Sequence, residues 1–254
     1  MKIEYFAFSE KCKRTHNEDS FTVFSLNNDN HCFIVCDGVG GGEFGEVASK
    51  TVADSIRQFF TARRIQKFTK ENIRESVVFA QQQLTLQAGK LHTTSMASTL
   101  ALIAFSFNRF IKCWIGDSLI FHWDEKGNFH KNETHSLVNV LIKSGEITPE
   151  EAKNHPKKNV ITRAVSANAS LLPDFETGKF NARHKFLLCS DGFTEAISET
   201  DLKNLWNNFS SVQTVGMHLQ KLTRQFSNDN STAIFIEFKP EIIRDFLSIF
   251  KLNF

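Results

Sequence analysis

The sequence has almost no tyrosine and no excess of charge of either sign. One tyrosine stands beside 26 phenylalanines, so the aromatic residues suit internal packing better than a polar recognition surface. Lys and Arg together number 30 and Asp and Glu 28, which gives a net charge of +2 at pH 7. Because such a chain has no general basic field to hold a phosphate backbone, nucleic acid is not an expected partner.

The chain also lacks paired cysteines and long apolar runs. Its five cysteines are an odd number without a Cys-x-x-Cys pair, and Cys32 and Cys36 lie on one expected strand, where they cannot reach each other. The N-terminus has no signal-peptide pattern, and no stretch approaches the roughly 20 apolar residues of a membrane span. We therefore expect a protein of the reducing cytoplasm with no transmembrane segment.

What the sequence does contain is a series of short apolar strands and two long helical segments. The helices are expected over 43–60 and 70–89. The expected strands are 3–8, 21–26, 31–36, 98–107, 110–115, 119–123, 159–164, 175–180, 185–189 and 231–238. Short hairpin links favour antiparallel pairing, so the predicted fold is α+β, with two mainly antiparallel sheets packed as a β-sandwich and helices outside.

We expect one domain over residues 1–254, with a flap or insertion over about 134–175. In the flap, Thr148 is the expected N-cap of a short helix and Pro149 its first residue. A C-terminal amphipathic helix is expected over about 240–254. This helix is expected to pack on the sandwich, and the alternative is an anchor for a partner or a membrane surface.

Four aspartates lie at the edges of apolar strands. Asp37, Asp117 and Asp191 follow strands, and Asp229 precedes one. Gathered at the rim of a sandwich, their carboxylates would repel one another unless a cation lay between them. Carboxylates without a nearby cysteine or histidine pair are ligands for Mg²⁺ or Mn²⁺ rather than for zinc. The alternative is that each Asp-Gly pair is only a turn that ends a strand, which is the commoner use of this dipeptide.

The glycines after Asp37 have a purpose if this end of the sandwich binds metal. Gly38 and the glycines at 40–42 would let the backbone pass close to the ions, free a carbonyl as a ligand, and lead into a helix that begins near residue 43. A phosphate loop of the NTPase kind would need Gly-Lys-Ser or Gly-Lys-Thr, but the first lysine after these glycines is Lys50. An NTPase loop is thereby excluded.

Seven motifs occur along the chain in a characteristic order. They are RTHNEDS (14–20), DGVGGGEFGEVAS (37–49), MASTL (96–100), IGDS (115–118), HSLVNVLIKSGEITPEEAKNHPKKNVITRAV (135–165), CSDGFTEAIS (189–198) and DNSTAI (229–234). In this order the chain resembles the metal-dependent type 2C, or PPM-type, Ser/Thr protein phosphatases, and most of all their short bacterial members. The resemblance covers about residues 3–238. It implies a β-sandwich flanked by helix pairs on both sides, with a binuclear metal site in a cleft at one end of the sheets.

The resemblance also implies roles for individual residues. Asp37 would bridge two ions, Asp191 and Asp229 would hold the first, and Gly38 would offer its carbonyl oxygen to the second. Glu18 matches the family acid that binds the water shell of the second ion.

Two further matches concern a third ion and the substrate. Asp117 with Asp191 matches the pair that recruits a third, weaker ion in bacterial relatives. Arg14 matches the arginine that clamps the substrate phosphate, and a guanidinium fork suits two phosphate oxygens. The alternative for Arg14 is an ordinary surface cation. Arg14, Asp37 and Asp191 are therefore the predicted catalytic residues.

The implied reaction is hydrolysis of phosphoserine or phosphothreonine in proteins. A metal-activated water would attack phosphorus directly, with Mn²⁺ or Mg²⁺ as cofactor and without a phospho-enzyme. Cys36 and Cys189 lie beside metal aspartates, but the phosphate loop and arginine of a cysteine phosphatase are missing. We expect a cytoplasmic monomer that opposes a bacterial Ser/Thr kinase. The alternatives are a pseudophosphatase that serves as an interaction module and a hydrolase of small phosphoesters.

Several positions depart from the family pattern. Val39 stands where animal members often have a histidine proposed as a general acid, so the group that protonates the leaving oxygen is unassigned, and His16 fits a surface residue better. Ala-Ser-Thr at 97–99 replaces the usual Gly-Thr-Thr, Leu119 replaces an arginine, and Ser-Ala at 166–167 replaces a glycine pair. None of these is a metal ligand, so they concern the substrate groove and the flap rather than the metal centre.

Overall fold

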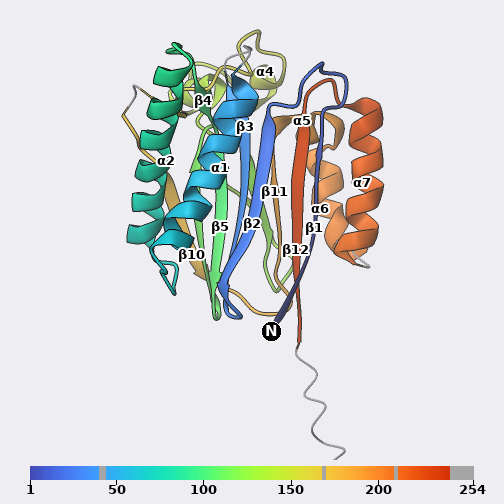
Figure 1. Ribbon diagram of the computed structural model, residues 1–254. Coiled ribbons are helices and arrows are strands. Elements are labelled where there is room, and N and C mark those ends of the chain that lie inside the picture. Colours follow the sequence, from blue (N-terminus) through green and yellow to red (C-terminus); the bar gives the residue numbers. More distant parts are fainter. Residues whose placement is uncertain (40–43, 168–169, 209–210, 241–254) are drawn as a thin grey trace, which may run out of the picture.

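Two antiparallel sheets lie face to face between two layers of helices in the computed structural model (Figure 1). The structure describes residues 1–39, 44–167, 170–208 and 211–240. The predicted α+β sandwich with helices outside is confirmed. Residues 40–43 of the glycine stretch and nearly all of the predicted C-terminal helix lie outside the described residues.

All strand pairs in both sheets are antiparallel. The five-stranded sheet has the order β1 (Lys2–Glu10), β12 (Ser231–Lys239), β11 (Lys185–Cys189), β7 (Leu119–Trp123) and β8 (Phe129–Lys131). The seven-stranded sheet has the order β10 (Asp174–Lys179), β6 (Arg109–Ile115), β5 (Leu100–Ser106), β3 (Asn30–Val39), β4 (Ala97–Ser98) and β9 (Val165–Ser166), with β2 (Asp19–Asn27) paired to β3.

Strand β3 shows why the sequence contains unbroken apolar runs. Cys32, Ile34 and Cys36 lie in the layer between the seven-stranded sheet and its helices. The alternate residues Phe33 and Val35 lie between the two sheets. Because both faces of the strand are covered, both sets of side chains must be apolar. This arrangement carries the chain from one end of the sandwich to Asp37 at the other.

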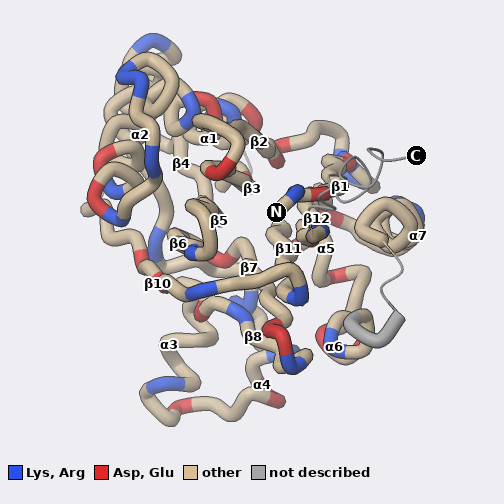
Figure 2. The backbone as a smooth tube through the Cα atoms, turned by 90° about the horizontal axis from the view of Figure 1, so that it is seen from below, with Lys and Arg blue, Asp and Glu red and all other residues tan. Residues whose placement is uncertain are grey.

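Each sheet is covered on its outer face by its own helices (Figures 1 and 2). Those on the seven-stranded sheet are α1 (Gly45–Ala62) and α2 (Lys70–Lys90). Those on the five-stranded sheet are α5 (Asp191–Ala196), α6 (Glu199–Asn208) and α7 (Val212–Phe226). Figure 2 shows that both signs of charge occur along α1 and α2, in agreement with the small net charge. Among the described residues, no helix has the length and apolar character needed to cross a lipid bilayer.

The flap contains two short helices, α3 (Leu137–Lys143) and α4 (Pro149–Lys153). The predicted cap of α4 is confirmed, because the Thr148 hydroxyl accepts a hydrogen bond from the Glu151 N–H and the Glu151 carboxylate accepts one from the Thr148 N–H. The helix therefore begins at Pro149, as its sequence indicates.

The predicted strand at 159–164 is wrong. In this segment only Ile161 forms a β-bridge, with Ser136. Two other backbone bonds join it to the start of the flap: the Leu137 N–H donates to the Val160 carbonyl at 2.8 Å, and the Thr162 N–H donates to the His135 carbonyl at 2.7 Å. The backbone of this segment thus bonds to the beginning of the flap and not to a sheet.

The predicted strand at 98–107 is present but broken at Thr99. The Thr99 N–H donates to the Asp37 carbonyl at 2.8 Å, and the Asp37 N–H donates to the Thr99 hydroxyl at 2.9 Å. The break separates β4 from β5 and joins this part of the chain to the end of β3.

The strand directions gather distant parts of the chain at one end of the sandwich. Strands β3, β6 and β11 finish at the end that is uppermost in Figure 1, and β2 and β12 begin there. The segments that carry the four predicted aspartates are therefore neighbours in space, and the N-terminus lies at the opposite end.

Candidate metal centre

The four predicted aspartates meet at the upper end of the sandwich, each delivered by a different element. Asp37 is in the last part of β3, Asp117 follows β6, Asp191 is the first residue of α5 after β11, and Asp229 directly precedes β12. Their charges perturb one another: the carboxylates of Asp191, Asp117 and Asp229 all raise the pKa of Asp37. The structure therefore brings together the residues that the sequence places far apart.

A fifth aspartate, Asp19, belongs to the same cluster, and the sequence prediction missed it. It lies directly opposite Asp37 in the β2–β3 ladder, with only 7% of its surface exposed. Its Oδ2 accepts a hydrogen bond from the Ser190 hydroxyl at 2.6 Å, whereas its buried Oδ1 has no hydrogen-bond partner among the described residues. The signal in the sequence was the second acid of the Asn-Glu-Asp run, since alternation along a strand sends Glu18 and Asp19 to different faces.

The glycine in each Asp-Gly pair lies where a second backbone segment passes. A Cβ on Gly38 would be 2.2 Å from the Gly45 carbonyl oxygen, and a Cβ on Gly192 would be 2.1 Å from the Asn230 carbonyl oxygen. Gly38 lies in strand β3 and Gly192 in helix α5, so neither pair is the simple turn that was the alternative interpretation. Both glycines allow the close chain approach that brings the aspartates together.

Glu18 is held at the start of helix α1. Its carbonyl accepts a hydrogen bond from the Gly38 N–H at 3.0 Å, and its own N–H donates to the side-chain oxygen of Asn230 at 2.9 Å. Its carboxylate lies so close to Gly45 that a Cβ there would be 2.5 Å from Oε2. A carboxylate at the first residue of a helix is favoured by the helix dipole. Glu18 therefore lies beside Gly38, next to the cluster, as expected.

Glu195 fixes the loop that carries Asp229, and the sequence gave no reason to single it out. Its Oε2 accepts hydrogen bonds from the Asn228 N–H at 2.8 Å, the Asp229 N–H at 3.2 Å and the Ser227 hydroxyl at 3.2 Å. Glu195 is in the same short helix as Asp191. One helix thus supplies one acid of the cluster and holds the backbone of another.

The cluster resists carrying its full negative charge. Burial raises the pKa of Asp37 well above its usual value, and the neighbouring Asp19 and Asp191 carboxylates raise it further. Burial together with Asp191 raises the pKa of Asp117 to about 7, and burial raises that of Asp19 to about 7 as well. Burial and Asp229 also raise the pKa of Asp191. Acids that are this difficult to ionise together require a bound cation to become fully charged near neutral pH.

Arg14 forms a hydrogen-bonded ion pair with one acid of the cluster, Asp229. Its Nη2 lies 2.6 Å from Asp229 Oδ2, and 57% of its side chain is exposed. This hydrogen bond to Asp229, together with that residue's charge, raises the pKa of Arg14. Arg14 therefore lies at the edge of the acid cluster, with part of its side chain open to solvent.

The donor set fits a hard divalent cation. The groups that meet are carboxylate oxygens and backbone carbonyls, which suit Mg²⁺ or Mn²⁺, and Asp19 Oδ1 is a buried oxygen free to accept a bond. Among residues 1–39, 44–167, 170–208 and 211–240, no three His, Cys, Asp or Glu side chains already surround a single point as a finished cage. Asp229 is instead bonded to Arg14, so it would have to turn to bind an ion.

Comparison with known proteins places this site in a family. A sequence model of the family described as protein phosphatase 2C matches residues 10–229. The chain belongs to the protein phosphatase 2C family. Its relatives include the serine/threonine phosphatase Stp of Listeria welshimeri, which is 29% identical over 233 residues, 88% of this chain and 91% of the relative.

Solved structures agree with this assignment. The serine/threonine phosphatase Stp1 of Staphylococcus aureus has a TM-score of 0.83 and 27% identity, with coverage of 94% of this chain and 96% of that chain. The catalytic domain of the phosphatase PstP in complex with two manganese ions has a TM-score of 0.78 and 25% identity, covering 92% of this chain and 97% of that one. The predicted family, fold and enzyme class, a protein serine/threonine phosphatase, are confirmed, and dependence on a divalent metal follows from the family.

The positions at which this phosphatase departs from the family pattern lie beside the centre. Val39 ends strand β3, and Ser98 is fully buried in the short β4 strand. Leu119 is the first residue of β7, after the Asp117 turn. The Ser166 carbonyl accepts a hydrogen bond from the Gln81 amide at 2.8 Å, so this position ties the flap end to α2. The side chain of Val39 cannot donate a proton, so no residue at that position serves as a general acid.

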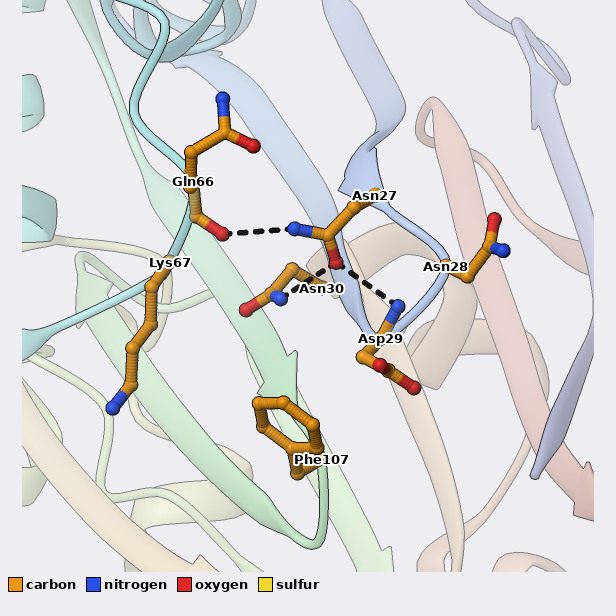
Figure 3. A pocket seen from close by; sticks show the side chains of 7 residues that line it. All are labelled: Asn27, Asn28, Asp29, Asn30, Gln66, Lys67 and Phe107. Carbon is orange, nitrogen blue, oxygen red and sulfur yellow. Dashed lines mark hydrogen bonds between the residues drawn. The ribbon is translucent and has the colours of Figure 1, made fainter.

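A hollow at the opposite end of this phosphatase has no acidic cluster (Figure 3). It is lined by Asn27, Asn28, Asp29, Asn30, Gln66, Lys67 and Phe107. Asn27 uses its amide internally, because its Oδ1 accepts from the Asp29 N–H and from the Asn30 amide, and its Nδ2 donates to the Gln66 carbonyl. The Asn27 bonds thus shape the β2–β3 hairpin turn.

Proposed function

We propose that this phosphatase hydrolyses phosphoserine and phosphothreonine in proteins at a centre of two divalent ions at the upper end of the sandwich. The observation that carries the proposal is that Asp37, Asp117, Asp191 and Asp229 lie at the same end of the sandwich, where burial and mutual repulsion raise the pKa values of three of them. Such a cluster is costly for the fold unless it binds cations.

The proposed ligand roles follow from the position of each acid. Asp37 lies opposite Asp19 on the neighbouring strand and is perturbed by the charge of Asp191 on α5, so it would contribute its carboxylate to both ions. Asp191 and Asp229 lie together, with Gly192 packed on the Asp229–Asn230 backbone, and hold the first ion.

The residues around Gly38 would hold the second ion. Gly38 offers its carbonyl oxygen there, and Glu18, which lies next to it at the start of α1, binds the water shell. Asp117, which perturbs both Asp37 and Asp191, holds a third and weaker ion together with Asp191. The ions in the cell are Mn²⁺ or Mg²⁺.

The residues of the chain and the bound ions divide the reaction between them. When bound, the two ions supply an activated water at neutral pH and neutralise charge on the phosphoryl oxygens. Arg14 orients the phosphate with its guanidinium fork, at the edge of the cluster where it is more than half exposed. Asp37 and Asp191 would hold the ions on short side chains whose backbone is fixed, Asp37 by the hydrogen bond from its N–H to the Thr99 hydroxyl and Asp191 at the start of α5.

A nucleophilic cysteine is not part of this mechanism. Cys36 and Cys189 are fully buried, and burial raises the pKa of both thiols far above the usual value. A thiol that stays protonated is a poor nucleophile, so these two cysteines do not support a cysteinyl phospho-enzyme, in agreement with the proposed direct attack by water.

The proposed setting follows from the substrate class. The partners are proteins phosphorylated on serine or threonine, and a bacterial Ser/Thr kinase that phosphorylates them is the opposing enzyme. We propose that the phosphatase acts in the cytoplasm as a monomer, with the whole chain as one domain.

Phosphate release from a phosphothreonine peptide tests the proposal. Activity should require Mn²⁺ or Mg²⁺, disappear in excess chelator, and exceed the activity on free nucleotides. Asp37→Asn should abolish activity while the far-UV circular dichroism stays unchanged, and the matched control Asp54→Asn, a surface acid paired with Arg57, should stay active. Full activity in chelator would refute the metal mechanism. Faster turnover of nucleotides would indicate a small-molecule phosphatase, and a folded, metal-binding but inactive protein would indicate a pseudophosphatase.

A further inference from the structure

One histidine, His135, joins the flap to the turn that carries Asp117. It lies between β8 and α3, with 7% of its surface exposed. Its N–H donates to the Gly116 carbonyl at 2.8 Å, and the Gly116 N–H donates to its ring Nδ1 at 3.2 Å. Both backbone polar groups of Gly116, the residue directly before Asp117, are therefore held by His135.

The hydrogen bonds of the ring determine where its proton lies. An amide N–H can only donate, so Nδ1 carries no proton. The other ring nitrogen, Nε2, is 3.0 Å from Asp174 Oδ2, and a carboxylate accepts, so Nε2 carries the proton. Arg163 pairs with the same carboxylate, with 3.5 Å between its Nη1 and Asp174 Oδ1. Its approach of 3.4 Å to Nε2 places two donors side by side and is not a hydrogen bond in this tautomer.

The turn has little room to move on its other side. Gly116 has φ +99°, and a Cβ there would be 2.7 Å from Thr99 Cγ2. The Ser118 hydroxyl is 2.7 Å from the Thr99 hydroxyl, which also accepts the Asp37 N–H. The Asp117 backbone is thus clamped between His135 and a residue that contacts the central acid of the metal cluster.

The return segment of the flap is bound to the same histidine. The His135 carbonyl accepts from the Thr162 N–H at 2.7 Å and from the Thr162 hydroxyl at 3.0 Å. Arg163 follows directly, so both sides of the flap meet at His135. His135 therefore connects both sides of the flap to the turn that carries Asp117.

We propose that His135 is a positioning residue that sets the direction of the Asp117 carboxylate toward its ion, with Asp174 selecting the ring tautomer that makes this possible. The inference rests on the proposed function, because it takes Asp117 as a metal ligand. Groups that orient a ligand from behind typically account for about 10- to 100-fold in metal affinity.

Two substitutions separate the two ring bonds. His135→Asn keeps an acceptor close to the place of Nδ1 and loses the donor to Asp174, whereas His135→Gln keeps a donor close to the place of Nε2 and loses the acceptor for Gly116. Mn²⁺ binding is measured by electron paramagnetic resonance of the free ion, and activity is measured on a phosphothreonine peptide across Mn²⁺ concentrations. We expect His135→Gln to weaken the most weakly bound Mn²⁺ about 10-fold and His135→Asn to stay closer to wild type.

The positioning role requires that the effect pass through Asp117. Asp117→Asn should therefore weaken the same ion, and adding His135→Gln to it should weaken binding no further. Thermal unfolding in chelator shows whether each variant folds. If His135→Gln does not fold, Asp174→Ala, whose side chain is half exposed, tests the same point. It should allow the second ring tautomer, visible in ¹⁵N spectra of the histidine ring, and weaken Mn²⁺ binding in the same direction.

Three results would overturn the inference. The first is a loss of Mn²⁺ affinity in the double variant Asp117→Asn/His135→Gln that equals the sum of the losses in the single variants. The second is unchanged Mn²⁺ binding in both His135→Gln and Asp174→Ala. The third is a His135 ring that carries its proton on Nδ1 in the wild-type protein. Failure of the proposed function would give a different result: the wild-type protein would bind Mn²⁺ but release no phosphate from the peptide. The Mn²⁺-binding measurements would then still test the role of His135.

Discussion

The acid cluster should destabilise the fold when divalent ions are withheld, and Asp117 provides the clearest test. Its pKa rises from 3.8 to about 7, mainly through burial and then through the charge of Asp191. A carboxylate whose pKa is higher in the folded state than in the unfolded chain costs nothing when both are neutral, below pH 4. Stability is lost as pH rises from about 4 to about 7, and the loss is complete above that range.

The size of this loss follows from the shift. About three pKa units at about 1.4 kcal/mol each give about 4 kcal/mol at pH 8 and about 2 kcal/mol at pH 5. Asp117→Asn removes the charge, so in excess chelator this variant should be more stable than wild type, by up to about 4 kcal/mol at pH 8. For a chain of this length that corresponds to a melting temperature about 10 °C higher.

Urea unfolding followed by circular dichroism, in chelator at pH 5, 6.5 and 8, measures the effect. The gap between Asp117→Asn and wild type should widen with pH, and the surface control Asp54→Asn should show no such trend. Saturating Mn²⁺ should stabilise both proteins and narrow the gap, because the variant keeps the ligands of the two main ions and only wild type has the Asp117 carboxylate for the third. A wild-type protein at least as stable as the variant at pH 8, or a gap that does not change with pH, would refute the reasoning.

Other predictions concern packing, acid stability and substrate binding. Gly38→Ala should lower the free energy of unfolding by about 3 kcal/mol or more, because its Cβ would meet the Gly45 carbonyl oxygen at 2.2 Å. Gly89→Ala should raise it by about 1 kcal/mol, because no atom lies within 4 Å of its Cβ and alanine favours helix α2. Equal urea midpoints for the two variants would contradict this. Burial, followed by the charge of Lys112, lowers the pKa of His122 from 6.5 to about 3, so the folded state resists protonation and stability falls as pH drops below 6.5. By pH 5 the free energy of unfolding should fall by about 2 kcal/mol more in wild type than in His122→Gln. Parallel plots of stability against pH for the two proteins would argue against this. Arg14→Ala should raise KM for a phosphopeptide more than it lowers kcat, and an unchanged KM would exclude the clamp.

The strands were predictable because burial on both faces leaves a strong signal. The apolar run of β3 ends at Asp37, and the structure confirms the strand predicted at 31–36. The strand prediction at 159–164 failed because its apolar residues suit a strand, whereas its backbone bonds to the start of the flap. Hydrophobic pattern alone does not distinguish these two destinations.

Helix α7 shows how tertiary packing outweighs local preference. The sequence prediction does not include it, and Gly216 and β-branched residues such as Val215 weaken its helical signal. The glycine is there because a Cβ would be 2.2 Å from the Phe6 ring. Packing against strand β1 therefore requires glycine at position 216, although glycine is unfavourable within a helix.

The sequence singled out most acids of the cluster, but not the residues that surround and hold them. Asp37 and Asp191 stand out because a carboxylate after an apolar strand is rare. Asp19 does not, because its importance depends on the register that places it opposite Asp37. Glu195 and His135 act through bonds to loops that are distant in sequence, and such bonds are set by the fold.

Anomalous diffraction from crystals soaked in Mn²⁺ tests the central claim most directly. We predict two strong peaks at the upper end of the sandwich, with Asp37 between them and Asp191 and Asp229 on one side, and loss of both peaks in Asp37→Asn. Crystals of active protein with no manganese at these residues, or with manganese only elsewhere, would contradict the account.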